Sequence, residues 1–186
     1  DGSGSGNGVT TGKNLTFVGA GTTGVSSGLH GYDIEITQAA TRTTHTGTVA
    51  LNQAMIDAEE QITITESGRS VDFKTKAGTT IEQTLNKLDK AIKTAGLNVE
   101  LIRDVSSKAV RNAPQQLTLR HTKFGSEYFF QVSSNTAGLL SSVADVSERA
   151  QNGVDVAGEI AGEGAIGRGR LLTGAGGFGA KAEGIV

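Results

Sequence analysis

The sequence predicts an α+β fold in which strands dominate and mostly antiparallel sheets carry one well-defined helix. Short segments alternate between apolar and polar residues, as half-buried strands do. Glycine is abundant, at 27 of 186 residues, which indicates many turns. One long segment in the middle of the chain has a helical period instead. Together these three observations favour sheets that pack against a single helix.

The predicted strands run along the whole chain. The clearest is 32–38, which places Tyr32, Ile34 and Ile36 on one face and polar residues on the other. A hairpin is indicated where two strands, 61–66 and 70–76, flank a short turn. The remaining predicted strands are 14–18, 97–103, 115–121, 127–134, 154–160 and a segment around 171–172. We expect 115–121 and 127–134 to pair with each other, because only a few turn residues separate them.

The well-defined helix is predicted at about 80–95. Thr79 and Glu82 have the spacing of a capping box, and Gly96 follows where a left-handed cap is expected. Four apolar residues recur on one face of this helix: Ile81, Leu85, Leu88 and Ile92. A lone helix of this length is marginal in water, so the apolar stripe must pack on a sheet. A short second helix is predicted at about 49–59 from similar spacing.

Two lobes are expected. The segment 46–133 contains the hairpin and the helix and forms one lobe. The flanking segments 1–45 and 134–186 form the other lobe. The chain therefore leaves this flanking lobe after residue 45 and returns to it at residue 134. Glycine-rich ends suit a hinge.

Composition narrows the classes of function. The chain carries 17 Lys and Arg against 19 Asp and Glu, and this net charge of −2 gives no attraction for nucleic acid or an anionic membrane. The absence of cysteine excludes disulfides and thiolate metal sites. No apolar run approaches the ~20 residues that cross a bilayer, and the first residues lack the pattern of a signal peptide. We expect neither nucleic acid nor a membrane as a partner.

The segment GEGAIGRGRLLTG contains the spacing G-x-G-x-x-G at Gly162, Gly164 and Gly167. In a dinucleotide-binding fold such a loop opens a helix whose N-terminus holds the phosphates. Here more glycines follow closely, and each costs a helix about 1 kcal/mol. We interpret these glycines as turn residues and predict no nucleotide cofactor.

Candidate catalytic residues have weak contexts. Ser26 lies in GVSSG, the pattern of a hydrolase nucleophile elbow, but the next strand leaves no room for the helix that an elbow requires. Asp33 and Glu35 could in principle act as an acid and a base, but the polar face of an amphipathic strand explains them far better. A hydrolase therefore remains only a distant alternative.

Candidate metal and modification sites are equally sparse. His30, His45 and His121 stand in separate predicted elements, without the spacing of a zinc site. The triplet Asn14-Leu15-Thr16 matches a glycosylation sequon, and exposed Ser and Thr could carry O-linked glycans. The sequence thus predicts no enzyme, no catalytic residue, no cofactor and no metal site, and it identifies no binding residue.

A resemblance to a known family emerges from three segments in a fixed order. GYDIEITQAATR (31–42) resembles a strand of bacterial flagellar filament proteins. The segment 70–101, SVDFKTKAGTTIEQTLNKLDKAIKTAGLNVEL, is similar to the flagellin IN motif. From residue 152, NGVDVAGEIAGEGAIGRGRLLTGAGG resembles the closing part of the same proteins, together with AEG at 182–184. The three matches cover most of 31–186.

The resemblance implies the surface-exposed outer (variable) domain of a flagellin, a secreted structural protein of the bacterial flagellum that serves motility. Its partners would be other flagellin subunits in a self-assembling homopolymeric filament. The segment 46–133 would lie far from the rod, and 1–45 with 134–186 near it. The start DGS favours flagellin, and the absence of long amphipathic helices at either end leads us to expect an internal part of a longer chain.

Two alternatives remain open. The filament cap protein, hook-associated protein two, belongs to the same group, and its outer lobes would fit the same patterns. A surface adhesion or glycan-binding module is the other alternative. Its first candidate residues are Tyr128, Phe129 and Phe130, since aromatic rings on exposed sheets can bind sugars.

Overall fold

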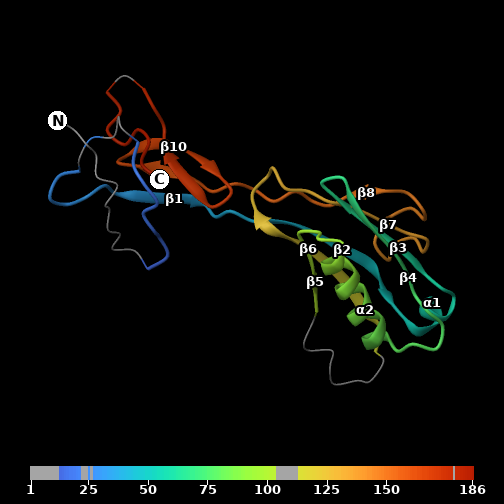
Figure 1. Cartoon of the computed structure of the whole chain (residues 1–186). Helices are drawn as coiled ribbons and strands as arrows, with labels where there is room; N and C mark the ends of the chain where they lie inside the picture. The colour runs from blue at the N-terminus through green and yellow to red at the C-terminus, as the bar shows by residue number, and fades with distance from the viewer. Residues whose placement is uncertain (1–12, 22–24, 26, 104–112, 178) are drawn as a thin grey trace. The chain divides into compact units, whose positions relative to one another are not determined.

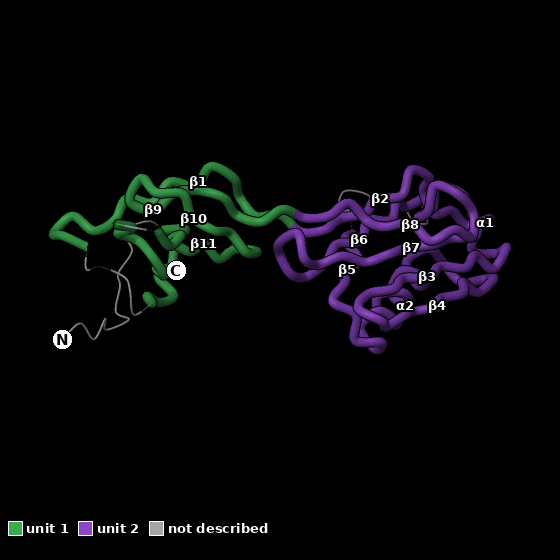
Figure 2. Tube along the Cα trace, turned by 90° about the horizontal axis from the view of Figure 1, so that it is seen from above, with its two compact units in different colours: residues 1–41, 154–186 green, residues 42–153 purple. Residues whose placement is uncertain are grey.

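A computed structural model describes residues 13–21, 25, 27–103, 113–177 and 179–186. The chain forms two compact units, which we call unit 1 (1–41 and 154–186) and unit 2 (42–153) (Figure 2). The divisions therefore lie at 41/42 and 153/154, whereas the sequence analysis placed them at 45/46 and 133/134. The predicted fold class is confirmed: the described residues contain three antiparallel sheets and two helices, of which one is long.

Unit 1 contains one antiparallel sheet of four strands. Its order is β1-β9-β10-β11, formed by β1 (Ile34–Gln38), β9 (Ala157–Ile160), β10 (Glu163–Arg168) and β11 (Leu171–Gly174). Figure 2 labels all four strands, and Figure 1 labels β1 and β10 on the ribbon. One face of this sheet buries a small apolar core around Ile160, Ala182 and Ile185. The predicted alternation of 32–38 places Tyr32 and Ile34 against that core, while Ile36 is 40% exposed beyond its edge.

The two segments of the chain that form unit 1, 1–41 and 154–186, are its two arms, and they are hydrogen-bonded to each other. The Val18 amide donates to the Val186 carbonyl at 2.8 Å, and the Gly21 amide donates to the Gly184 carbonyl at 2.8 Å. The predicted strand at 14–18 is wrong, because this segment forms no ladder of its own. Its backbone turns to the end of the chain instead, through an isolated bridge between Ala20 and Ile185.

Unit 2 contains two separate antiparallel sheets. The first has the order β2-β6-β5, with β2 (Arg42–Leu51), β6 (Gln115–Phe124) and β5 (Val99–Ile102). The second has the order β4-β3-β7-β8, with β4 (Arg69–Lys74), β3 (Gln61–Glu66), β7 (Gln131–Ser134) and β8 (Glu148–Arg149). The hairpin predicted around Ser67 and Gly68 is confirmed as β3–β4, and both turn residues have positive φ, as the favoured two-residue hairpin turns require.

The strands β6 and β7 do not pair, so the expectation of a hairpin between 115–121 and 127–134 is wrong. β6 is the central strand of its sheet, and β2 and β5 occupy both of its edges. β7 therefore crosses to the other sheet and pairs with β3, where Val132 lies opposite Ile64. Phe130, which is fully buried, anchors this crossing in the core.

The helix α2 (Ile81–Thr94) packs against β4 and β5, one edge strand of each sheet in unit 2. Its predicted apolar stripe is buried in a single core that both sheets share. Each such side chain contributes about 1.5–3 kcal/mol on burial. Among the described residues, no helix is long and apolar enough to span a membrane.

Both helix starts differ from the prediction. The N-cap of α2 is Thr80, whose hydroxyl accepts from the Gln83 amide at 3.2 Å, so the predicted box of Thr79 and Glu82 is shifted by one residue. The second helix is only α1 (Gln53–Asp57), since 49–51 belong to β2 and Asn52 caps the helix. In α2, Thr80 and Gln83 satisfy the capping-box pattern one position further along the chain.

The glycines of GEGAIG have several roles. Gly162 adopts φ +73 in the turn between β9 and β10. Gly167 lies within β10, where a Cβ would come within 1.6 Å of the Val156 carbonyl oxygen, so only glycine allows this backbone approach. Gly164 has open space around it. The interpretation as turn residues therefore holds for Gly162, but β10, which it did not predict, contains the other two.

We expect Gly167→Ala to destabilise unit 1 by about 1–3 kcal/mol, because the new methyl group overlaps backbone that cannot move aside cheaply. The matched control Gly164→Ala in the same strand should change stability by less than about 0.5 kcal/mol. Hydrogen exchange of the β9 and β10 amides measures both. Equal protection in the two variants would contradict the close approach at Gly167.

Candidate functional site

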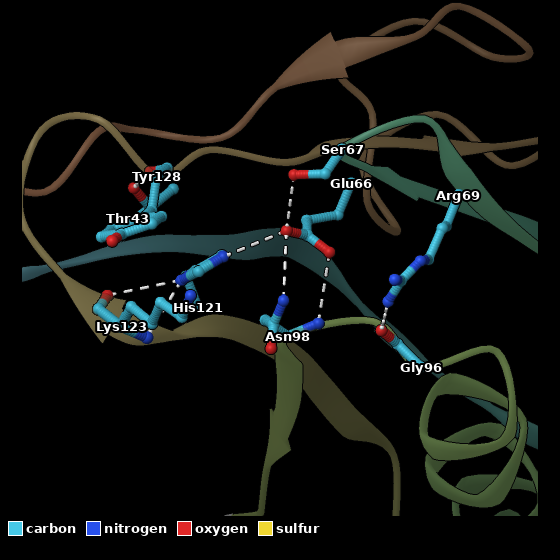
Figure 3. Close-up of polar contacts among 9 residues, drawn as sticks. All are labelled: Thr43, Glu66, Ser67, Arg69, Gly96, Asn98, His121, Lys123 and Tyr128. Carbon is cyan, nitrogen blue, oxygen red and sulfur yellow. Dashed lines mark hydrogen bonds and ion pairs between the residues drawn. The ribbon is translucent and has the colours of Figure 1, made fainter.

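A buried polar cluster joins the two sheets of unit 2 and is the strongest candidate for a functional site in the described residues. It brings together Glu66 at the end of β3, Asn98 just before β5, and His121 in β6 (Figure 3). The side chains of Glu66 and His121 are 4% and 1% exposed. Two ionisable groups with so little contact with solvent need partners inside the protein.

Glu66 accepts three hydrogen bonds. The Ser67 hydroxyl donates to Oε1 at 2.8 Å, and Asn98 donates through its amide nitrogen at 3.3 Å and its Nδ2 at 3.4 Å. Burial by itself raises the pKa of the Glu66 carboxyl. The hydrogen bonds from Ser67 and Asn98, together with the His121 ring, outweigh that effect and lower the pKa below its ordinary value. Glu66 is therefore a carboxylate at neutral pH.

His121 has a defined orientation. The Lys123 amide donates to its Nδ1 at 3.0 Å, so the neutral ring carries its proton on Nε2. Nε2 lies 3.5 Å from Glu66 Oε1, which is long for a hydrogen bond but close for an electrostatic contact. The ring also stacks on Tyr128, with centroids 5.2 Å apart and planes inclined by 13°.

Further polar contacts surround this cluster. Arg69 donates from Nη1 to the Gly96 carbonyl at 2.6 Å and so binds β4 to the end of α2 (Figure 3). The Thr43 hydroxyl donates to the Tyr128 carbonyl and accepts from the Gly153 amide at 3.0 Å. The contacts of Thr43 give partners to the Tyr128 carbonyl and the Gly153 amide, which are partly or fully buried.

The sequence contains a signal for this cluster that the pattern reading missed. Glu66 has the same parity in β3 as Ile62 and Ile64, which face the core. His121 likewise shares parity with the buried Leu117 and Leu119 in β6. A polar residue at an apolar position of an alternating strand predicts a buried, partnered group. The partners cannot be predicted this way, since they come from different sheets.

The pair Glu66–His121 combines a carboxylate and an imidazole, the groups that many enzymes use for proton transfer. Here the pair is closed to solvent, and the adjacent Ser67 hydroxyl donates to Glu66 rather than to His121. The arrangement as it stands can hold two sheets together, but it presents no reacting atom to a solute.

The candidate catalytic residues from the sequence remain apart from this cluster. Ser26 lies outside the described residues. Asp33 and Glu35 are exposed in unit 1, where the Asp33 carbonyl accepts from the Ala161 amide. Gly162, Gly164 and Gly167 belong to β10 and its turn, and no helix follows them in the described residues up to 186.

The three histidines lie in different places. His30 is exposed in a turn, and Nε2 of His45 lies 2.6 Å from the Leu140 carbonyl. His121 alone joins the buried cluster. Within the described part of the chain, no group of three or more His, Asp or Glu side chains is placed to hold a metal ion. Asn14 of the sequon is exposed, and its glycosylation stays a prediction.

The aromatic candidates for glycan binding do not form one platform. Phe130 is fully buried, and Tyr128 is half-buried against His121. Phe129 is 42% exposed, but the Arg149 guanidinium covers one face of its ring at 3.9 Å.

Comparisons with known proteins point to one group of folds. No protein-family model matches the chain. No curated protein matches it either. Among solved structures, the D2-D3 domains of the flagellar cap protein FliD from Escherichia coli are similar, with a TM-score of 0.51 and 17% identity over 86% of this chain and 78% of that one. The corresponding D2-D3 domains from Serratia marcescens give 0.50 and 17% over 84% and 88%.

A longer fragment of the E. coli cap protein, containing D1-D2-D3, gives a TM-score of 0.48 at 16% identity. This chain covers 44% of that fragment. The likeness to the D2-D3 structures shows that this chain has the fold of those two domains. All three structures are of flagellar cap proteins, whereas the sequence resemblance favoured flagellin.

The buried cluster makes stability depend on pH. Because the pKa of Glu66 is lower in the folded state than its ordinary value of about 4.3, its contribution is full above that value and is lost as the pH falls through the folded pKa. We expect Glu66→Gln to cost about 1–3 kcal/mol at pH 7. This difference from the wild type should shrink below about pH 4.

Urea unfolding of both proteins between pH 3 and pH 7 measures that difference directly. Glutamine keeps the size of the side chain but replaces one acceptor oxygen with an N–H donor, so the pH dependence of the difference, rather than its size at one pH, reports the charge. A difference that stays constant over the whole pH range would show that the charge of Glu66 does not stabilise the fold.

Proposed function

We propose that this chain is the outer, two-unit part of a flagellar filament cap protein, a structural component that works outside the cell at the tip of the filament. The observation that supports this proposal best is the similarity in fold to the D2-D3 domains of two cap proteins. The similarity extends over 84–86% of this chain. Its partners would be other flagellar subunits, and its contribution would be to assembly and motility rather than to a reaction.

The connectivity of the chain supports this role. Unit 1 is built from both arms of the chain, and 18–21 hydrogen-bonds to 184–186. Arms that enter and leave side by side suit a module inserted at one point of a longer protein. Unit 2 is inserted in turn into unit 1.

The chemistry of the described side chains also favours a structural role. Glu66 and His121 are closed to solvent, and Glu60, which is 2% exposed, is held by two hydrogen bonds from Thr136. Buried polar groups that are held by hydrogen bonds fix how elements pack. We therefore propose that the chain is not an enzyme.

Flagellin is the second candidate. It is favoured by the ordered resemblance of 31–42, 70–101 and 152–184 to flagellar filament proteins. The two candidates differ in location, since a cap protein occupies the tip and a flagellin the whole shaft.

Immunogold electron microscopy distinguishes the candidates. Antibodies raised against the 186-residue chain should label the filament tips of cells that produce the parent protein, and cells without its gene should show no label. Label along the shaft would favour flagellin instead. Label on the cell body, or on no part of the flagellum, would contradict both.

A further inference from the structure

A shallow groove of about 480 Å³ runs between β4 and α2 in unit 2. Val71 and Asp72 line it from the strand, and Lys87, Lys90 and Ala91 line it from the helix. Val71 is 6% exposed, Ala91 is half-buried, and both lysines are exposed. The groove thus has an apolar floor and a basic rim, and its volume is in the range of ligand-binding clefts.

The strand side of this groove is a free sheet edge. β4 is the terminal strand in the order β4-β3-β7-β8. Glu66 and Arg69 flank the two-residue turn and form a hydrogen-bonded pair, so the next pair along, Thr65 with Ser70, does not exchange backbone hydrogen bonds. By the same alternation, Asp72 and its partner Thr63 do not exchange backbone hydrogen bonds either.

The backbone N–H and C=O groups of Ser70 and Asp72 therefore point away from β3. The bond from the Thr75 amide to the Glu60 carbonyl at 2.9 Å fits the same alternation. Within the described residues, no hydrogen bond reaches these outward groups of Ser70 or Asp72. A row of unpaired strand groups is a template on which another strand can add.

The charge of the groove comes from two unengaged cations. No ion pair within the described residues includes Lys87 or Lys90, whereas Lys93 one turn further on is paired with Asp89 at 2.6 Å. The Asp72 carboxylate does not neutralise the lysines closely, because Thr63 holds it at 2.7 Å on the far face of the hairpin.

We propose that the groove between β4 and α2 binds an extended acidic segment of a partner protein, which adds as a strand to β4. Its backbone would pair with Ser70 and Asp72, a mode in which main-chain hydrogen bonds give affinity and side-chain pockets give specificity. Alternate small apolar side chains would lie on Ala91 and Ala95. Side chains of a strand alternate between its two faces, so the acidic side chain that meets Lys87 and Lys90 would be two positions further along, on the same α2-facing side as the apolar ones.

The charge preference is local to this groove. The chain as a whole has a net charge of −2, so it does not attract acidic peptides through its total charge. An extended segment fits better than a helix, because only an extended backbone can use the free edge of β4. This inference does not depend on the proposed flagellar role.

The test uses the 186-residue chain and a blocked seven-residue peptide with glutamate at position 2, valine at positions 4 and 6 and threonine elsewhere, so that glutamate and valine share one face of the strand. Nuclear magnetic resonance should show shifts of the Ser70 and Asp72 amides on titration, together with slower hydrogen exchange of both. Two control peptides define the mode of binding. One replaces glutamate with lysine, and one carries methyl groups on alternate backbone nitrogens, which prevents strand pairing; both should bind at least about tenfold more weakly.

The matched variants are Lys87→Glu with Lys90→Glu, and Lys13→Glu with Lys76→Glu as a control of equal charge change at exposed sites outside the groove. Fluorescence anisotropy should show about five- to tenfold weaker binding of the glutamate peptide by the first variant, and less than a twofold change for the second. All four positions are exposed, so folding should be unaffected.

Three results would overturn the proposal. The first is absence of binding at about 1 mM glutamate peptide. The second is equal binding of the methylated peptide, which would exclude strand addition. The third is self-association of the chain that the Lys87→Glu, Lys90→Glu variant abolishes, since the occupant of the groove would then be a second copy of this chain.

Discussion

The apolar stripe of α2 is the constraint on which the rest of unit 2 depends. The two sheets in this unit share no strand, so they need something between them that buries apolar surface from both. Ile81, Leu85, Leu88 and Ile92 provide it, and all four are at most 7% exposed. At about 1.5–3 kcal/mol for each side chain, the stripe contributes an energy comparable to the whole stability of a small domain.

The polar cluster follows from the same packing. Where the sheets approach each other, Glu66 from one and His121 from the other become buried, and each keeps partners that compensate for the lost water. A buried pair of this kind adds little net stability over apolar residues, but it penalises any other register of the strands that carry it. Unit 1 is held differently, by backbone contacts so close that Gly167 has no room for a side chain.

How far the sequence predicts this structure differs from element to element. The β3–β4 hairpin and α2 follow from local signals, namely a two-residue turn and a four-residue apolar stripe. β10 was missed because its alternation is diluted by Gly164 and Gly167, and the second of these exists for a contact with Val156 that no local pattern reveals. The pairing of β7 with β3 also depends on distant residues, since β6 is already paired on both edges. The candidate site was not predicted for the same reason, as three different elements supply its groups.

The most direct test of this account is Leu88→Ala, which removes the centre of the α2 stripe, where Leu88 is 1% exposed. The variant should lose about 2–5 kcal/mol of stability. If the stripe unites the two sheets, hydrogen exchange will show the Ile64 amide of β3 and the Leu119 amide of β6 losing equal protection. Loss of protection in one sheet alone, with the other unchanged, would show that each sheet is stable without the shared helix and would contradict the account.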